Sequence, residues 1–321
     1  MRERAVLGID VGGTKTLCAL VDERHRIVAA KKFPTAPEDG RKKFVARFIR
    51  TTDGLLKEAR HEKLKVIGVG VAVAGQVCDG EVKVAPNLLP LESLNFRRLI
   101  RQQLKLDACL GNDVQLALQA EHQLGAARGY RHVLGVFFGT GIGGAAIIHG
   151  QVYRGASGLG GQVGAIVTHA IGGAEALDSH GILDRMTSKA AIGGSALALA
   201  AKQAAPHLFE EVGTDLAKVS WGALKRSIRK GDKAVEELLR ARLRLAGVAL
   251  SNVVNFLNPE MLVLGGGLVE EMPQLVRAEV EQSLRSHLVP EVSKALKVKL
   301  AHFRNKAAAI GAAHCAFEHL G

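Results

Sequence analysis

The stretch Leu7–Thr16, which reads LGIDVGGTKT, places a glycine turn directly after a short run of apolar residues. The apolar run Ala5–Ile9 predicts a strand, and Asp10–Lys15 predicts a turn. Because glycine has no Cβ, successive backbone N–H groups in such a turn can converge on an anion. Thr14 and Lys15 add a hydroxyl donor and an ammonium donor. The stretch therefore predicts a phosphate-binding turn at the end of a strand.

Two more glycine-rich turns lie farther along the chain, each after a predicted strand. Gly139–Gly144 follows Val133–Phe138 and precedes a predicted strand at Ala145–His149, and Gly265–Gly267 follows Met261–Leu264. One glycine turn can be required by a tight bend alone, whereas three turns after three strands favour anion binding. Neither the dinucleotide fingerprint with its ribose-binding acid nor the P-loop pattern occurs in the sequence, which disfavours both of those folds.

The remaining pattern alternates strands with helices and partly repeats itself. Further strands are predicted at Thr16–Val21, Ile27–Lys32, Val66–Val73, Ala108–Leu110 and Val152–Tyr153, and helices at Lys42–Ala59, Leu94–Leu104, Val114–Leu124, Ala234–Leu257 and Ala307–His319. The order of strand, glycine turn and strand occurs near the N-terminus and again after residue 132. The sequence therefore predicts an internally duplicated α/β fold with a cleft between its halves.

The composition is that of a globular protein, and it excludes several other classes. The chain has 321 residues, of which 47% are hydrophobic and 23% charged. This length fits one large domain or two, and two domains are favoured. The longest apolar stretches, Val66–Ala74 and Ser195–Ala201, are too short to span a bilayer. No secretory signal follows Met1, so a soluble cytoplasmic protein without a membrane partner is expected.

Charge and cysteine content limit the choice of partners. Lys and Arg number 43 against 31 Asp and Glu, a formal net charge of +12, yet the basic residues are scattered and aromatic residues make up only 4%. The scattered charge favours ordinary solvated helix faces over a nucleic-acid-binding surface. A positive field that attracts a nucleotide is the alternative interpretation. The cysteines lack the close spacing of zinc or redox motifs, and Cys18 and Cys109 lie in apolar runs typical of buried thiols.

Three polar residues at predicted strand ends carry candidate chemistry. Asp10 would point into the cleft, where it either holds a divalent cation, directly or through water, or caps the turn. Asp113 follows a predicted strand and stands at the expected N-cap of a helix, so it is either a general base for an attacking hydroxyl or a cap. The neighbouring Asn112 amide is expected to be free to orient a polyol.

At these residues the sequence resembles the ROK family of sugar kinases and regulators, within the actin-like/hexokinase ATPase superfamily. The resemblance rests on segments that run in family order: LGIDVGGTKT (7–16), GVGVAVAGQV (68–77), APNLLP (85–90), GNDVQLALQAEHQLGAARG (111–129), FFGTGIGGAAIIHGQVYRGASGLGGQVG (137–164) and NPEMLVLGGGL (258–268). It implies two actin-like (ribonuclease H-like) domains with a central cleft: an N-terminal domain of residues 1–115 with the C-terminal helix 305–321 packing back on it, and a second domain of residues 116–304.

The resemblance also implies site residues. ATP and its phosphates would be bound by Asp10, Gly12, Gly13, Thr14, Lys15, Thr140, Gly141, Gly143, Gly144, Gly265, Gly266 and Gly267. Sugar would be bound by Gly75, Asn87, Asn112 and Asp113, with Asp113 as the catalytic base and Asp10 as the Mg²⁺ residue. Gln162 and Asp184 are further expected sugar contacts.

The acceptor side departs from the family pattern. Where glucose-type members have Gly-Glu-x-Gly-His, this chain has Gln162 for the glutamate and Ala165 for the histidine. The stretch 171–184 lacks the cysteines of the family's zinc loop, and Asp184 stands where that loop ends in glutamate. We therefore expect no structural zinc, because His149, His169 and His180 without thiolates make a poor zinc site.

These observations predict an ATP-dependent carbohydrate kinase, glucokinase-like, that uses Mg²⁺ and forms a homodimer. An N-acyl hexosamine kinase, another sugar or polyol kinase, and a catalytically weak sugar-sensing regulator remain alternatives. Because the first phosphate turn starts at residue 10, we do not expect the N-terminal DNA-binding module of the family's repressors.

Overall fold

The computed structural model describes residues 3–78, 80–168 and 181–320, and its contacts divide the chain into two compact units. Unit 1 comprises Met1–Arg128, Arg154–Gly160 and Lys306–Gly321, and unit 2 comprises Gly129–Tyr153 and Gly161–Asn305. Unit 1 thus continues beyond residue 115, where the sequence analysis placed the boundary. The domain division drawn from the sequence stays a prediction.

Unit 1 is built on a five-stranded sheet in the order β3-β2-β1-β4-β7. The first three strands form antiparallel pairs, whereas β4 and β7 run parallel to β1. The elements of unit 1 are β1 (Arg4–Val11), β2 (Lys15–Asp22), β3 (Ile27–Pro34), η1 (Pro37–Asp39), α1 (Gly40–His61), β4 (Lys65–Val73), β5 (Gln76–Cys78), β6 (Glu81–Val84), η2 (Pro86–Leu91), α2 (Phe96–Leu104), β7 (Ala108–Asn112), α3 (Asp113–Leu124) and α12 (Ala307–Leu320).

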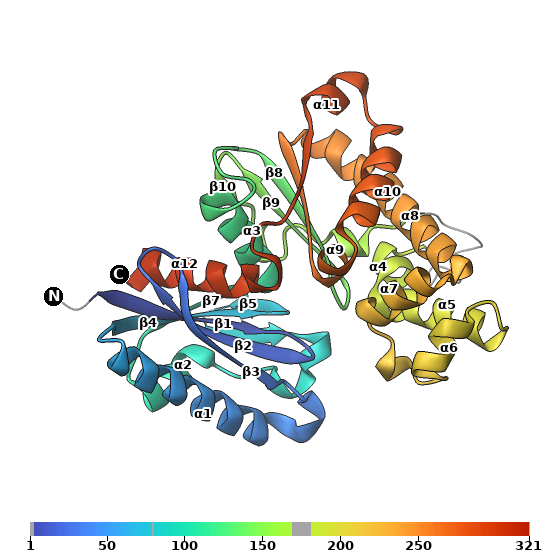
Figure 1. The fold of residues 1–321 in the computed structure, drawn as a ribbon. Coiled ribbons are helices and arrows are strands. Elements are labelled where there is room, and N and C mark those ends of the chain that lie inside the picture. The colour runs from blue at the N-terminus through green and yellow to red at the C-terminus, as the bar shows by residue number, and fades with distance from the viewer. Residues whose placement is uncertain (1–2, 79, 169–180, 321) are drawn as a thin grey trace. The chain divides into compact units, whose positions relative to one another are not determined.

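Helices cover both faces of this sheet, as Figure 1 shows. Because successive side chains of a strand point to opposite faces, Leu7 packs with α1 and α2 while Val6 packs with α3 and α12. Helix α12 lies so close to the sheet that a Cβ on Gly70 would come within 1.8 Å of the Ala312 carbonyl oxygen. The C-terminal segment is therefore an integral part of unit 1.

Unit 2 repeats the strand order of unit 1. Its sheet runs β10-β9-β8-β11-β12, with antiparallel pairs among the first three strands and parallel pairs from β8 onward. Its elements are β8 (Val133–Phe138), β9 (Ile142–Ile148), β10 (Gln151–Val152), η3 (Val163–Ala165), α4 (Leu183–Thr187), α5 (Lys189–Ala201), α6 (Pro206–Val212), η5 (Leu216–Lys218), α7 (Trp221–Lys230), α8 (Lys233–Leu257), β11 (Met261–Gly265), α9 (Gly267–Glu271), α10 (Pro273–Arg285), α11 (Pro290–Ala295) and β12 (Lys297–Leu300), with η6 (Arg304–Lys306) at the return to unit 1. The duplication predicted from the sequence is confirmed.

Strand β9 corrects one boundary drawn from the sequence. It begins at Ile142, not at Ala145, so Gly143 and Gly144 belong to the strand and not to the preceding turn. Glycine is required inside this strand because a Cβ on Gly144 would lie 2.5 Å from the Gly161 carbonyl oxygen. The glycine run is thus partly a packing feature, and the turn itself shortens to residues 139–141.

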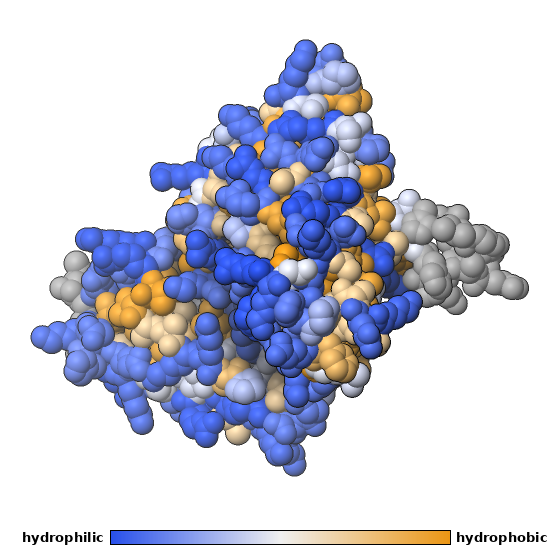
Figure 2. All heavy atoms as spheres, turned by 45° about the vertical axis from the view of Figure 1, so that its right-hand side comes forward, coloured by the Kyte–Doolittle hydropathy of each residue, from blue (hydrophilic) through white to orange (hydrophobic). Residues whose placement is uncertain are grey.

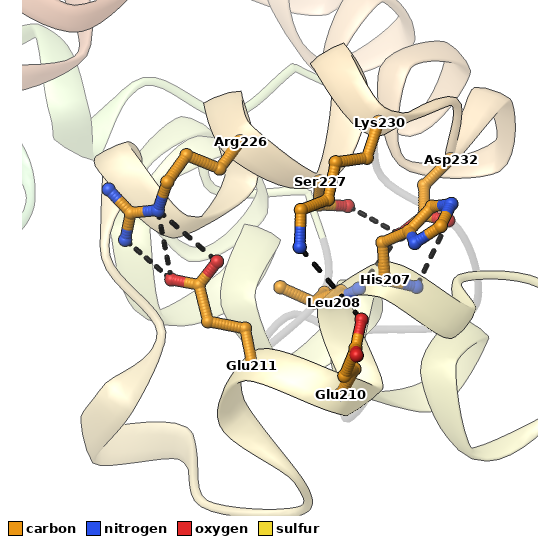
Figure 3. A network of polar contacts seen from close by, with 8 residues as sticks. All are labelled: His207, Leu208, Glu210, Glu211, Arg226, Ser227, Lys230 and Asp232. Carbon is orange, nitrogen blue, oxygen red and sulfur yellow. Dashed lines mark hydrogen bonds and ion pairs between the residues drawn. The ribbon is translucent and has the colours of Figure 1, made fainter.

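Basic side chains on the helices of unit 2 form ion pairs with nearby acidic side chains, as the polar network in Figure 3 illustrates. Arg226 of α7 forms an ion pair with Glu211 of α6 at 2.5 Å. In the same network the Asp232 carboxylate accepts hydrogen bonds from the Leu208 amide at 2.8 Å and from the Ser227 hydroxyl at 2.6 Å. These contacts favour the interpretation of the basic segments as solvated helix faces that also fasten α6 to α7.

The surface seen in Figure 2 is mostly hydrophilic, with apolar side chains gathered in several separate patches. Within residues 3–78, 80–168 and 181–320, no helix has the length and apolar character needed to cross a bilayer.

Candidate functional site

The first glycine turn, Gly12–Thr14, joins the antiparallel strands β1 and β2 in unit 1. The Gly12 amide donates to the Lys15 carbonyl at 3.2 Å, which closes the turn. The fully buried Thr35 holds it from behind, because its hydroxyl donates to the Gly12 carbonyl at 2.7 Å and its amide donates to the Thr14 carbonyl at 3.0 Å. The sequence analysis missed Thr35, whose only signal is a hydroxyl residue just beyond an apolar-polar strand.

Two carboxylates stand at the carboxyl edge of the unit 1 sheet. Asp10 lies near the end of β1 and Asp113 begins α3 directly after β7, and these strands run parallel with β4 between them. Burial and, to a lesser extent, the charge of Asp113 raise the pKa of Asp10 to about 7 against the opposing charge of the Lys15 ammonium. Burial likewise raises the pKa of Asp113 to about 6. Two half-buried carboxyls with raised pKa values, one of them raised in part by the charge of the other, are typical of catalytic or cation-binding sites.

The N-cap of α3 differs from the one expected. Asn112, not Asp113, is the N-cap: its Oδ1 accepts the amides of Val114 and Gln115, both at 3.1 Å. The expectation of a free Asn112 amide is also wrong, since its Nδ2 donates to the Gly75 carbonyl at 3.2 Å and to Asp113 Oδ1 at 3.0 Å. Because the neighbouring asparagine serves as the cap, the Asp113 carboxylate is not required for that purpose.

The expected sugar residues of unit 1 cluster around the same edge. A Cβ on Gly75 would lie 2.4 Å from the Val84 carbonyl oxygen, so the chain passes tightly against the end of β6, just before η2. On η2, the Cβ of Asn87 lies 3.4 Å from the position of a Cβ on Gly13. The exposed Asn87 is therefore adjacent to the first glycine turn.

A segment from beyond the hairpin of β9 and β10 also belongs to this edge of unit 1. Gln76 Nε2 donates to the Ser157 carbonyl at 2.8 Å, and Gln115 Nε2 donates to the Gly158 carbonyl at 3.1 Å. The sequence analysis did not single out these glutamines. Nothing in a single sequence pairs them with a loop that lies more than forty residues away.

The second glycine turn lies in unit 2 between β8 and β9. The Gly139 amide donates to the Gly141 carbonyl at 2.8 Å, with Thr140 at the tip of the turn. The third turn lies beside it, because Gly265 pairs with Phe137 on the neighbouring strand β8. Gly266 has a φ of 93° and a Cβ there would lie 2.4 Å from the Phe138 carbonyl oxygen, so only glycine fits. Gly267 then begins α9.

Gln162 and Asp184 also lie in unit 2 but differ in their surroundings. Gln162 is exposed and precedes η3, where it makes no side-chain cap. Asp184 is half-buried in the first turn of α4, and its Oδ1 accepts the Ile142 amide at 2.5 Å. The predicted contacts of both residues with a sugar stay predictions.

Of the three histidines near the expected zinc loop, His149 alone lies within the described residues. His169, His180 and the stretch 171–180 lie outside the described residues, whereas His149 lies at the end of the hairpin strand β9 with its ring against that of His132. Over residues 3–78, 80–168 and 181–320, the structure holds no group of three or more histidine, cysteine, aspartate or glutamate residues arranged to bind a metal ion.

The structure thus brings the predicted residues together as two groups. Unit 1 holds Asp10, Gly12, Gly13, Thr14, Lys15, Gly75, Asn87, Asn112 and Asp113, and unit 2 holds Thr140, Gly141, Gly143, Gly144, Gln162, Asp184, Gly265, Gly266 and Gly267. The role of each residue in binding or catalysis stays a prediction.

The similarity of the chain to known proteins is evidence that does not depend on this geometry. Residues 6–318 match the ROK family. The chain is 26% identical to the glucokinase of Halalkalibacterium halodurans, covering 97% of this chain and 94% of that protein. It is 27% identical to the N-acetylgalactosamine kinase AgaK of Shewanella sp. (strain ANA-3), covering 95% and 94%. A crystal structure of a ROK family glucokinase from Streptomyces griseus, in complex with glucose and AMPPNP, is similar with a TM-score of 0.83 at 27% identity over 98% of this chain and 99% of that one.

Proposed function

Because the chain belongs to the ROK family and has its two-domain actin-like fold, we propose that it is an ATP-dependent kinase that phosphorylates a carbohydrate hydroxyl. One observation carries the proposal furthest. Asp113 stands beside Asp10 at the sheet edge that carries the first glycine turn, and the Asn112 cap leaves its carboxylate available. That arrangement supplies a base and a phosphate-binding turn at one edge, as phosphoryl transfer to an alcohol requires.

The nucleotide would be held by backbone amides. The turn Gly12–Thr14 and the turn 139–141 each follow the central strand of a sheet, and Gly266 closes a third turn beside the second. Lys15, close enough to Asp10 to lower its pKa, would neutralise phosphate charge. The similar glucokinase from Streptomyces griseus, whose crystal structure contains AMPPNP, supports ATP as the donor.

Magnesium fits the donor set of unit 1. Asp10 is a half-buried carboxylate whose ionised form is disfavoured both by burial and by Asp113, so a divalent cation would stabilise it. Mg²⁺ is commonly held by one or two carboxylates together with substrate phosphates and water, which matches a single aspartate beside a phosphate turn. Asp10 would hold the ion, directly or through water, and the ion would neutralise charge on the transferred phosphoryl group.

Asp113 would accept the proton of the attacking hydroxyl. The hydrogen bond from Asn112 Nδ2 at 3.0 Å orients the carboxylate, which would accept the proton from the substrate hydroxyl on its other oxygen. With its pKa near 6, Asp113 is ionised at neutral pH and still basic enough to share a proton in the transition state. Gly75, Asn87 and Asn112 would line the acceptor side of the same edge.

The acceptor is a hexose or an N-acyl hexosamine. Relatives that phosphorylate either class match over nearly the whole chain. Gln162 and Ala165, which replace the glutamate and histidine of glucose-type members, remove a charged acceptor and a donor, so glucose recognition would be weaker. A coupled assay of ADP release over glucose, N-acetylglucosamine and N-acetylgalactosamine tests the proposal, and absence of turnover with every sugar and polyol offered would refute it.

A sugar-sensing role is the second candidate, and the observation that favours it is the loss of those two acceptor residues. In that case the chain would bind a sugar and a nucleotide without transferring phosphate. Calorimetric binding of both ligands without ADP release would favour the sensor over the kinase. The presence of Asp10 and Asp113 at one edge favours the kinase.

We further propose a cytoplasmic homodimer. A kinase that consumes ATP requires the compartment that supplies it, and the buried Cys18, Cys109 and Cys315 form no disulfide, which is compatible with a reducing compartment. Phe256 on α8 is 87% exposed, and such a large apolar side chain would be buried if α8 takes part in self-association. Light scattering would show twice the monomer mass, and Phe256→Ser would weaken the dimer if this helix takes part in it.

A further inference from the structure

Asp184 contacts the second glycine turn, and its position suggests a role other than sugar binding. We propose that Asp184 is a positioning residue for that turn, which acts on nucleotide binding through the backbone of Ile142. The inference rests on the proposed kinase function, because it assigns the nucleotide as the ligand whose affinity Asp184 controls. It changes the expectation from the sequence, in which Asp184 replaces a sugar-binding glutamate.

The first observation is the direct contact. Asp184 Oδ1 accepts the Ile142 amide at 2.5 Å, where β9 leaves the turn. A hydrogen bond to an ionised acceptor is stronger than one between neutral groups. A Cβ on Gly141 would lie 2.7 Å from the same oxygen, so the glycine makes room for the carboxylate. The side chain therefore fits against the turn from one side.

The second observation is an independent contact from the same corner of the chain. The amide of Lys189, the first residue of α5, donates to the Thr140 carbonyl at 3.2 Å. The Ser188 amide donates to the Asp184 carbonyl at 2.9 Å, which links the two contacts. The corner between α4 and α5 thus holds the turn at its tip and at its exit.

The third observation is the close packing around Asp184 on the side of η3. A Cβ on Gly164 would lie 3.3 Å from the Asp184 Cβ and 2.3 Å from the Ile142 carbonyl oxygen. The Leu183 amide also donates to the Ile166 carbonyl at 2.9 Å. Asp184 is therefore packed where η3, α4 and the turn meet, and its carboxylate is directed to the turn.

The physical reason for such a contact is the flexibility of the turn. Two glycines flank Thr140, so ordering the turn around a phosphate costs more conformational entropy than ordering other residues. A carboxylate that holds the Ile142 amide before the nucleotide binds reduces this entropy cost. It therefore increases the affinity for the nucleotide. The close approach of Asp184 to both Gly141 and Gly164 shows that glycine at these two positions makes room for this carboxylate.

The test separates nucleotide affinity from sugar affinity. Calorimetry would give the Kd of AMPPNP and, separately, the Kd of the best sugar substrate for the wild type, Asp184→Ala and Asp184→Asn. We expect Asp184→Ala to raise the Kd of AMPPNP about 10- to 100-fold, the loss expected of a charged hydrogen bond, with the sugar Kd changed by less than about twofold. Asp184→Asn keeps an acceptor oxygen. Its Kd for AMPPNP should therefore lie about midway, on a logarithmic scale, between those of the wild type and Asp184→Ala.

Asp215→Asn is the matched control, because Asp215 also accepts a backbone amide in unit 2, that of Ala217 at 2.9 Å, far along the chain from the turn. It should change neither Kd. Amide exchange of Ile142 in the unliganded protein should accelerate at least about tenfold in Asp184→Ala, and this readout does not depend on any ligand.

The outcomes separate the two proposals. A wild type that binds neither AMPPNP nor any sugar refutes the kinase function and the inference with it. A wild type that binds AMPPNP, together with an Asp184→Asn variant that melts like the wild type, leaves only the inference in question. An increase confined to the sugar Kd, an equal increase in both, or no change in either would then overturn it.

Discussion

Asp113→Asn should separate catalysis from stability. The substitution keeps the shape of the side chain and removes its ability to accept a proton as a base. A positioned general base contributes roughly 100- to 10,000-fold to a rate, so kcat should fall by that factor, equivalent to about 3–5 kcal/mol of transition-state free energy. The Kd of the nucleotide should stay within about threefold, because Asp113 is not part of a glycine turn.

The same substitution should stabilise the folded chain, and the structure indicates by how much. Burial raises the pKa of Asp113 from its ordinary 3.8 to about 6. Each pKa unit corresponds to about 1.4 kcal/mol, and solvent at a half-buried carboxyl reduces the resulting cost of ionisation to about 1–2 kcal/mol. Because the folded state binds this proton more tightly than the unfolded state, the cost is complete above about pH 6 and disappears as the pH falls below 3.8. Asparagine never ionises, so its gain in stability should be larger at pH 8 than at pH 5.

Urea unfolding at pH 5 and pH 8, combined with a coupled assay of ADP release, measures both effects. Asp107→Asn is the control, since this exposed carboxylate precedes β7 in the same unit and pairs only loosely with Arg101, at 3.5 Å. It should leave kcat and the pH dependence of stability unchanged. An Asp113→Asn enzyme with near-wild-type kcat, or one that is less stable at pH 8 than at pH 5 relative to the wild type, would refute the reasoning.

Three further predictions follow from other parts of the structure. The hydrogen bond from Cys109 lowers the pKa of the Cys315 thiol below its ordinary value of 9.0, so the rate of iodoacetamide alkylation of Cys315 should have its midpoint below pH 9, and Cys109→Ala should move that midpoint upward; an unchanged midpoint would contradict the pairing. Gly70→Ala puts a Cβ 1.8 Å from a backbone oxygen of α12 and should cost at least about 3 kcal/mol in urea unfolding, a loss that a melting temperature equal to the wild type would exclude. Asp232→Ala leaves the buried Ser227 hydroxyl and the amides at the start of α6 without their acceptor and should cost about 1–3 kcal/mol, whereas Asp215→Ala, at an exposed cap, should cost less than about 1 kcal/mol.

The elements themselves were largely predictable from local pattern. Apolar runs bounded by glycine marked β1, β4, β8 and β11 to within two residues, because a buried strand must be apolar and must end where the chain turns. The boundary of β9 was wrong because Gly143 and Gly144 have turn composition but strand conformation. At Gly144 a side chain is excluded by the segment packed against it, which a local pattern cannot reveal.

The cap of α3 shows the same limit at the site. Asn112 and Asp113 are both good N-cap residues, so composition alone could not choose between them. The backbone decided: Asn112 has the extended conformation of a cap, with φ −66° and ψ 139°, because it is also the last residue of β7 and pairs with β4. That choice is what leaves the Asp113 carboxylate available for chemistry.

The sequence by itself determined which residue types stand at the strand ends, namely the glycine turns and the carboxylates to which we assign phosphoryl transfer, because these can be recognised from local order. Only the tertiary structure decided how these pieces are supported: Thr35 behind the first turn, Asp184 beside the second, and Gln115 on the segment around Gly158. Each of these contacts joins residues more than twenty positions apart. Their pairing depends on sheet order and close packing, which no local pattern of residues encodes.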